Sequence, residues 1–153
     1  MAKLQIAAGV AAVLTMYDGS AVAQVPQEYL GVWVSTQNNQ NNSLNCKRPD
    51  WALRENDGLI NITRRKVEHW ESGCDVSSFR ILKSQKESAE VVLACGGEGM
   101  TWRTREIWSL QPIEARKALI VVQLQSSEQR DEGKRPTTRM QNEIVSSLYL
   151  ECR

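Results

Sequence analysis

Short apolar stretches, separated by polar turn residues, follow one another along most of this chain. Within each stretch the apolar residues either alternate with polar ones or run together over strand length, which is the pattern of β-strands. The predicted strands span residues 29–35, 51–55, 59–70, 76–84, 89–95, 100–110, 119–125 and 144–152. This set of about eight strands predicts an all-β fold, namely a small antiparallel barrel built as a meander, with a β-sandwich as the alternative.

The alternation is clearest at residues 100–110, MTWRTREIWSL. One face of this predicted strand carries Trp102, Thr104, Glu106, Trp108 and Leu110, and the other carries Arg103, Arg105 and Ile107. Successive strand residues point to opposite sides of a sheet, so the tryptophan face is expected to pack in the core. The charged face points outward, like Arg64, Lys66 and Glu68 of the 59–70 segment. A transmembrane barrel needs an apolar outer band, so these charges disfavour one.

Polar segments connect the predicted strands. Residues 36–45, TQNNQNNSLN, predict a low-complexity loop, and residues 126–138 predict a second hydrophilic loop. Residues 111–119 allow either one helical turn after Pro112 or a loop. Glycine-containing turns are expected at residues 57–58, 71–73 and 96–99. Such turns join consecutive strands as hairpins.

The first residues have the pattern of an export signal. A positive charge at Lys3 is followed by an uncharged apolar stretch over residues 4–16, which is too short to span a bilayer. The small-residue pattern Ala-Val-Ala ends at Ala23, so we expect cleavage there and a mature chain that begins at Gln24. A buried N-terminal helix is the alternative, which the Gly-Ser pair after the apolar stretch disfavours. No later apolar run is long enough to cross a membrane, and we expect a periplasmic or secreted protein.

All four cysteines follow the predicted cleavage site: Cys46, Cys74, Cys95 and Cys152. An even number of cysteines in an exported chain predicts two disulfides. A metal site is disfavoured, because structural zinc sites use closely spaced Cys or His ligands and this spacing does not occur here. Four cysteines allow three pairings, of which the predicted strands favour Cys46–Cys74 and Cys95–Cys152.

Composition and charge narrow the class of protein further. The expected mature chain, residues 24–153, suits a single domain. The sequence has 19 basic and 18 acidic residues, and a formal net charge of +1 lacks the basic excess of a nucleic-acid-binding protein. Five tryptophans stand against one phenylalanine, which suits a small core. A closed sheet leaves no exposed edge, so we expect a monomer.

The first predicted strand contains Gly31-Val32-Trp33. This Gly-x-Trp motif resembles the signature of the calycin barrels, which include the lipocalins, and of the small barrel inhibitors of metalloproteases in bacterial periplasms. The resemblance covers Gly31 and Trp33 and the overall plan of strands and disulfides; the other lipocalin motifs are not found. It implies a ligand carrier or a protease inhibitor in which Trp33 packs across the closed end of the barrel. Gly31 would let a neighbouring tryptophan lie against the backbone.

No residue pattern predicts a catalytic centre, a cofactor or a metal. His69 is the one histidine, and no Gly-x-Ser-x-Gly motif accompanies it. The glycines of residues 96–99 lack the Lys-Ser/Thr ending of a phosphate-binding loop. Carboxylate pairs for acid–base chemistry could be drawn from Glu68, Glu71, Glu98 and Glu106. Nothing marks one pair among them, so we expect no enzyme, with a small hydrolase that uses His69 and a glutamate as the enzymatic alternative.

We therefore expect a non-enzymatic exported barrel that binds a small ligand or a protein of the cell envelope. A carrier needs a roomy apolar interior, so an interior filled by Trp33, Trp102 and Trp108 would argue against one. A protease inhibitor would act through a strand edge or through residues 24–30, QVPQEYL. A structural role in the cell envelope is the third alternative, with the polar loops 36–45 and 126–138 as contact surfaces.

Overall fold

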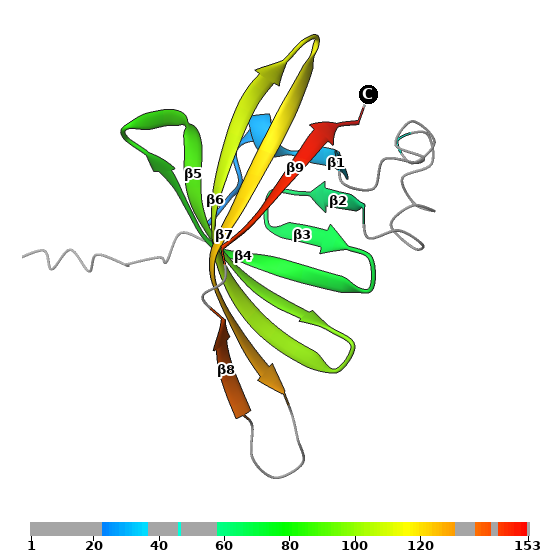
Figure 1. Ribbon diagram of the computed structural model, residues 1–153, viewed down its shortest axis with the longest axis vertical. Helices are drawn as coiled ribbons and strands as arrows, with labels where there is room; N and C mark the ends of the chain where they lie inside the picture. The colour runs from blue at the N-terminus through cyan, green and yellow to red at the C-terminus, as the bar shows by residue number, and fades with distance from the viewer. Residues whose placement is uncertain (1–22, 37–45, 47–57, 131–136, 142–143, 153) are drawn as a thin grey trace, which may run out of the picture.

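The computed structural model describes residues 23–36, 46, 58–130, 137–141 and 144–152 (Figure 1). Its regular elements are η1 (Gln27–Tyr29), β1 (Gly31–Ser35), β2 (Leu59–Ile62), β3 (Lys66–His69), β4 (Ser72–Leu82), β5 (Gln85–Gly97), β6 (Met100–Ile113), β7 (Arg116–Arg130), β8 (Thr137–Gln141) and β9 (Val145–Glu151). Each strand pairs with its neighbours in the antiparallel sense. The predicted all-β fold is confirmed.

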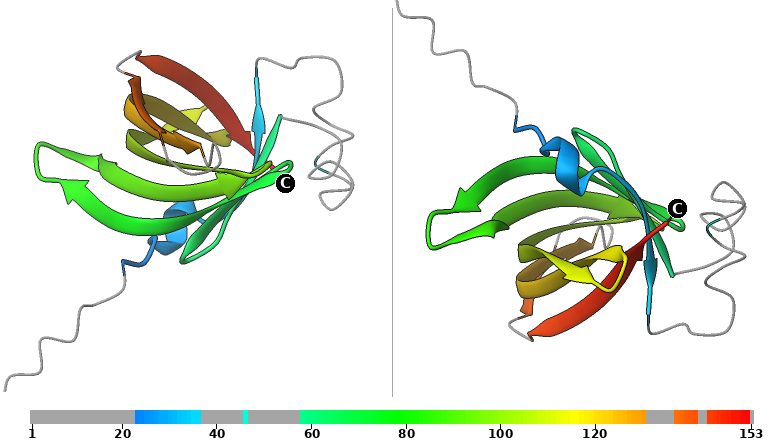
Figure 2. Two further views of the ribbon diagram at one scale, coloured as in Figure 1. Left: turned by 90° about the horizontal axis from the view of Figure 1, so that it is seen from below. Right: turned by 90° about the horizontal axis from the view of Figure 1, so that it is seen from above.

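Strands β1 to β7 follow one another around the sheet as a meander. The sheet closes because β9 pairs with both β1 and β7, which gives an eight-stranded barrel (Figure 1, Figure 2). β8 and β9 lie one after the other along β7, since Gln141 pairs with Ser126 and Val145 pairs with Gln123. The predicted small antiparallel barrel is therefore confirmed, and the β-sandwich alternative is wrong.

Two hairpins lie where other structure was predicted. Residues 59–70, predicted as one strand, form β2 and β3. Thr63 turns the chain between them: its Oγ1 donates to the Lys66 carbonyl and accepts from the Lys66 N–H. Residues 111–119, predicted as a helical turn or a loop, contain the hairpin between β6 and β7, with Glu114 at φ 53° in the turn.

The two predicted polar loops have different outcomes. In the second predicted loop, residues 126–130 belong to β7 and residues 137–138 belong to β8. These residues pair through backbone hydrogen bonds, β7 with β6 and with β8, and such pairing needs no apolar side chains. After Thr36, the first predicted loop lies outside the described residues, as does the predicted strand at 51–55.

Aromatic rings of the core gather around Tyr29, just before β1. Trp33 and Trp108 are 0% and 1% exposed. The Tyr29 ring meets the Phe79 ring edge to face, with ring centroids 5.3 Å apart, and its centroid lies 6.2 Å from that of Trp108. Trp33 is thus a fully buried ring of the core.

The segment before β1 covers one end of the barrel (Figure 2). The N–H of Val25 donates to the Arg64 carbonyl between β2 and β3 at 2.9 Å. The hydroxyl of Tyr29 donates to the Glu87 carbonyl near the start of β5 at 3.1 Å. Val25 and Tyr29 are both buried, so this segment reaches across the barrel from one hairpin to another. Residues 1–22, which hold nearly all of the predicted signal peptide, lie outside the described residues.

Two disulfides are present, but the predicted pairing is wrong. Cys74 lies directly opposite Cys95 on the β4–β5 ladder and is bonded to it, with Cα atoms 3.9 Å apart. Cys46 is bonded to Cys152, whose N–H donates to the Val32 carbonyl of β1. The prediction failed because it placed Cys74 in a hairpin turn. β4 in fact begins at Ser72, so the strand register brings Cys74 to Cys95.

Candidate functional site

A cavity of about 140 Å³ lies inside the barrel. Its polar lining comes from β3, β6, β7 and β9 and consists of His69, Glu106, Gln123, Ser147 and Tyr149, together with the Trp108 indole. The remaining lining side chains are aliphatic and are contributed by β2, β3, β5, β7 and β9. The cavity therefore combines aliphatic side chains with polar groups that converge on it, and small-molecule sites likewise combine apolar lining with placed polar groups.

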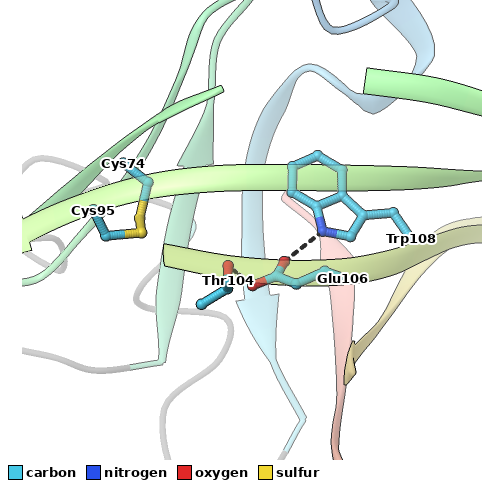
Figure 3. Close-up of a disulfide and its surroundings, with 5 residues drawn as sticks. All are labelled: Cys74, Cys95, Thr104, Glu106 and Trp108. Carbon is cyan, nitrogen blue, oxygen red and sulfur yellow. Dashed lines mark hydrogen bonds between the residues drawn. A yellow bond between two sulfur atoms is a disulfide. The ribbon is translucent and has the colours of Figure 1, made fainter. Parts of the chain in front are cut away.

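Among the described residues, Glu106 is the acidic group that lines this cavity, and Figure 3 shows it on β6 between Thr104 and Trp108. It lies on the inward face of β6, as the alternation predicts, and is 9% exposed. Trp108 and Thr104 lie two residues away on the same face. The Trp108 Nε1–H donates to Oε2 at 2.7 Å, and the Thr104 hydroxyl donates to Oε1 at 2.8 Å. The carboxyl group is thus oriented by side chains of its own strand.

Burial changes the acidity of two groups in the cavity. Burial raises the pKa of Glu106, and the hydrogen bonds from Trp108 and Thr104 oppose that shift without cancelling it. Burial also raises the pKa of Tyr149, a hydrogen bond with Ser147 opposes the shift, and the Glu106 charge adds to it. A buried ionised carboxylate is costly, so the site favours whatever neutralises Glu106.

The structure brings together only part of the predicted acid–base set. His69, at the end of β3, lines the same cavity as Glu106. Glu68 points outward from β3 and accepts a hydrogen bond from the Asn61 side chain at 2.8 Å. Glu71 and Glu98 lie in two turns and line a separate cleft of about 290 Å³ with Trp70 and Trp102. Of the four glutamates considered, Glu106 shares the barrel cavity with His69, and Glu68 lies with His69 along a separate pocket of about 450 Å³.

The tryptophans fill the barrel only in part. Trp33 and Trp108 are buried, whereas Trp102 is partly exposed and packs at the edge of the core. The remaining cavity is small compared with the ~300–1,000 Å³ of drug-sized sites. A cavity of about 150 Å³ can still hold a molecule the size of benzene. The interior therefore excludes long or bulky ligands and leaves room for a compact one.

The segment predicted as an inhibitory arm is largely tied to the barrel. Its residues Val25 and Tyr29 are 3% and 1% exposed, and both make the cross-barrel hydrogen bonds described above. This part of the segment is therefore unable to enter a partner's active site while the barrel end stays closed.

The Gly-x-Trp motif has a different physical basis from the one predicted. A Cβ placed on Gly31 would meet no atom within 4 Å, so close approach of a tryptophan does not require this glycine. Its φ of 126° does require it, since side chains rarely tolerate this conformation. Trp33 is held by its indole N–H, which donates to the Tyr29 carbonyl at 3.0 Å.

The described residues hold neither a cluster of metal ligands nor a membrane-spanning helix. In those residues, no three His, Cys, Asp or Glu side chains gather in a way that could hold a metal ion. Within the same ranges, no helix has the length and apolar character needed to cross a membrane.

Comparisons with protein-family models, with curated proteins and with solved structures find no match for this chain. The calycin resemblance carried by Gly31 and Trp33 therefore stays a prediction.

Proposed function

We propose that this protein is a non-enzymatic binding barrel that holds a compact small molecule in its interior cavity. The observation that carries the proposal is Glu106, a carboxyl group that is 9% exposed and lies in the cavity wall. Burying a carboxyl group costs free energy unless a partner compensates it. Buried polar groups with a perturbed pKa that converge on a cavity are typical of functional sites.

The cavity lining also supports a ligand of mixed character. Gln123, Ser147 and Tyr149 offer polar contacts on the β7 and β9 side, while Leu93 and Val121 offer apolar surface. A ligand with a small hydrocarbon body and one polar group would satisfy both parts. Longer ligands are disfavoured because the cavity measures only about 140 Å³.

We infer that the protein works as an exported monomer, in the periplasm or outside the cell, after loss of residues 1–23. The two disulfides support an oxidising compartment, because such bonds are rare in the cytosol. The closed barrel supports the monomer, because its sheet leaves little unpaired edge.

A cavity-filling variant tests the proposed function. Val121 lines the cavity, whereas its neighbour Val122 points away from it and is partly exposed. Binding of cyclopentylamine and cyclopentanol to the oxidised protein is measured by isothermal titration calorimetry. We expect Val121→Phe to weaken binding at least about tenfold, because the ring would occupy the cavity, and Val122→Phe to leave it unchanged. Equal affinity in both variants would place the ligand elsewhere and reject the proposal.

A small hydrolase is the second candidate, because His69 and Glu106 line one cavity. A hydrolase of this kind would turn over a compact ester such as p-nitrophenyl acetate, and His69→Ala would remove that turnover. If the wild-type protein hydrolyses the ester no faster than buffer does, the candidate is rejected.

A further inference from the structure

We propose that the ligand of the barrel cavity is a compact organic cation, a protonated amine whose N–H groups donate to the Glu106 carboxylate. This inference rests on the proposed function and adds the chemical class of the ligand. It follows from three features of the cavity: the free acceptor capacity of Glu106, the charge of the lining, and the volume.

The first feature is that Glu106 has acceptor capacity left. Its Oε1 accepts one hydrogen bond from Thr104 and its Oε2 accepts one from Trp108. An ionised carboxylate offers about four lone-pair sites. Both donors lie on β6 itself (Figure 3), and Glu106 also lines the cavity, so a ligand in the cavity can reach the carboxylate. A ligand ammonium can use the remaining lone-pair sites without displacing either bond.

The second feature is the charge of the lining. Among the residues that the structure describes, no lysine or arginine lines the cavity. The groups that face it are His69 from β3, Gln123 from β7, and Ser147 and Tyr149 from β9, alongside aliphatic side chains. A cationic ligand would supply the charge that a buried carboxylate needs, and charge-assisted hydrogen bonds between the two are among the strongest that proteins form.

The third feature is the volume. The cavity measures about 140 Å³, and an apolar cavity of about 150 Å³ holds benzene, which has about six non-hydrogen atoms. The hydrocarbon part of the cation is therefore a small ring or a short branched chain, which would pack against side chains such as Ile60, Leu93 and Val121.

Cyclopentylamine and cyclopentanol provide a matched test. They share one ring and differ in whether the polar group is charged at neutral pH. Isothermal titration calorimetry on the oxidised protein should show the amine binding about tenfold to hundredfold more tightly, because a charged partner strengthens the hydrogen bond to Glu106. Glu106→Gln keeps the shape of the side chain and removes the charge, so in this variant the amine should bind no more tightly than cyclopentanol.

Glu98→Gln is the control, because Glu98 is exposed, lies outside the barrel cavity and changes the net charge equally. It should keep the amine preference. A loss of preference in Glu98→Gln would place the cation in the cleft between Trp70 and Trp102 and overturn the inference. Circular dichroism and a melting curve show that each variant is folded.

The remaining outcomes separate this inference from the proposed function. If cyclopentanol binds as tightly as cyclopentylamine, and Val121→Phe abolishes both, the barrel binds ligands but the cation inference is wrong. If the amine preference survives in Glu106→Gln, Glu106 is not the anchor and the inference is again wrong. If neither probe binds, both the inference and the proposed function are rejected.

Discussion

Gly97, the last residue of β5, is predicted to be intolerant of even one added methyl group. A Cβ at this position would lie 2.6 Å from the Glu71 carbonyl oxygen and 2.8 Å from the Cβ of Ser72. Gly97 pairs with Ser72 on the β4–β5 ladder, so neither of these atoms can move without shifting the turn between β3 and β4. Substitution by alanine must therefore push two backbone segments apart.

The expected size of the effect can be separated from the general effect of replacing glycine. Overpacking of this kind costs about 1–3 kcal/mol. Any compatible Gly→Ala substitution gains about 0.4–1 kcal/mol, because the unfolded chain loses freedom. Gly73 lies on the adjacent strand, and a Cβ there would meet no atom within 4 Å. Gly73→Ala thus carries only the gain, and Gly97→Ala carries the same gain and the clash.

Urea denaturation of the oxidised protein measures both variants. We expect Gly73→Ala to be as stable as the wild type or slightly more stable. The free energy of unfolding of Gly97→Ala should be about 1–3 kcal/mol lower than that of Gly73→Ala. The slope of free energy against urea should stay unchanged, because the surface exposed on unfolding is nearly the same. If the two variants agree within about 0.5 kcal/mol, the close approach of the two turns is not a feature of the folded protein.

Three further predictions concern the disulfide at the chain end and two buried acids. Replacing Cys46 and Cys152 together by serine should lower the free energy of unfolding by up to about 4.8 kcal/mol, since the bond closes a separation of 106 residues; denaturant titration against the wild type measures the loss. Tyr29→Phe should cost about 0.5–1.5 kcal/mol near neutral pH, by loss of the hydrogen bond to Glu87. Because burial raises the pKa of Tyr29 from 10.0 to about 12, alkaline melts should show the wild type losing stability across that range and the variant losing less. Glu106→Gln should stabilise the protein at neutral pH more than at about pH 4. The pKa of Glu106 is raised in the folded state, so the neutral carboxyl present in acid carries no burial penalty, whereas the carboxylate present at neutral pH does. Melting curves at the two pH values measure this difference. Equal gains at both pH values would contradict the burial of the charge.

The barrel was predictable because local alternation carries the information. In MTWRTREIWSL, each residue placed on the core side is buried or partly buried, and Arg103 and Arg105 on the other side are exposed. Period-two alternation reports which side of the sheet a residue faces, whatever the strand's neighbours are. Short connections between such strands then leave a meander as the simplest topology.

The disulfide pairing was not predictable from the same information. A disulfide needs its two Cα atoms within a narrow distance range, and that distance depends on the register between strands. Cys74 follows Gly73 in a stretch with turn character, and no residue pattern there indicates that β4 already includes it. The hairpin of β2 and β3 was missed for a related reason: Thr63 makes the turn through its side chain, in a segment otherwise rich in strand formers.

The cavity could not be predicted from the sequence, because an empty space inside the barrel depends on side chains from several strands at once. Alternation correctly placed Glu106 on the inner face, but the space beside it depends on what lies opposite. Glu106 pairs with Gln123 of β7, which in turn pairs with Val145 of β9. The register between β6 and β7 shifts between Arg105 and Glu106. The residue opposite Glu106 therefore cannot be found by assuming regular strand pairing. Once the register is known, the neighbours of the acid can be named: Gln123 lies opposite it, and Ser147 and aliphatic side chains such as Val121 line the space that is left.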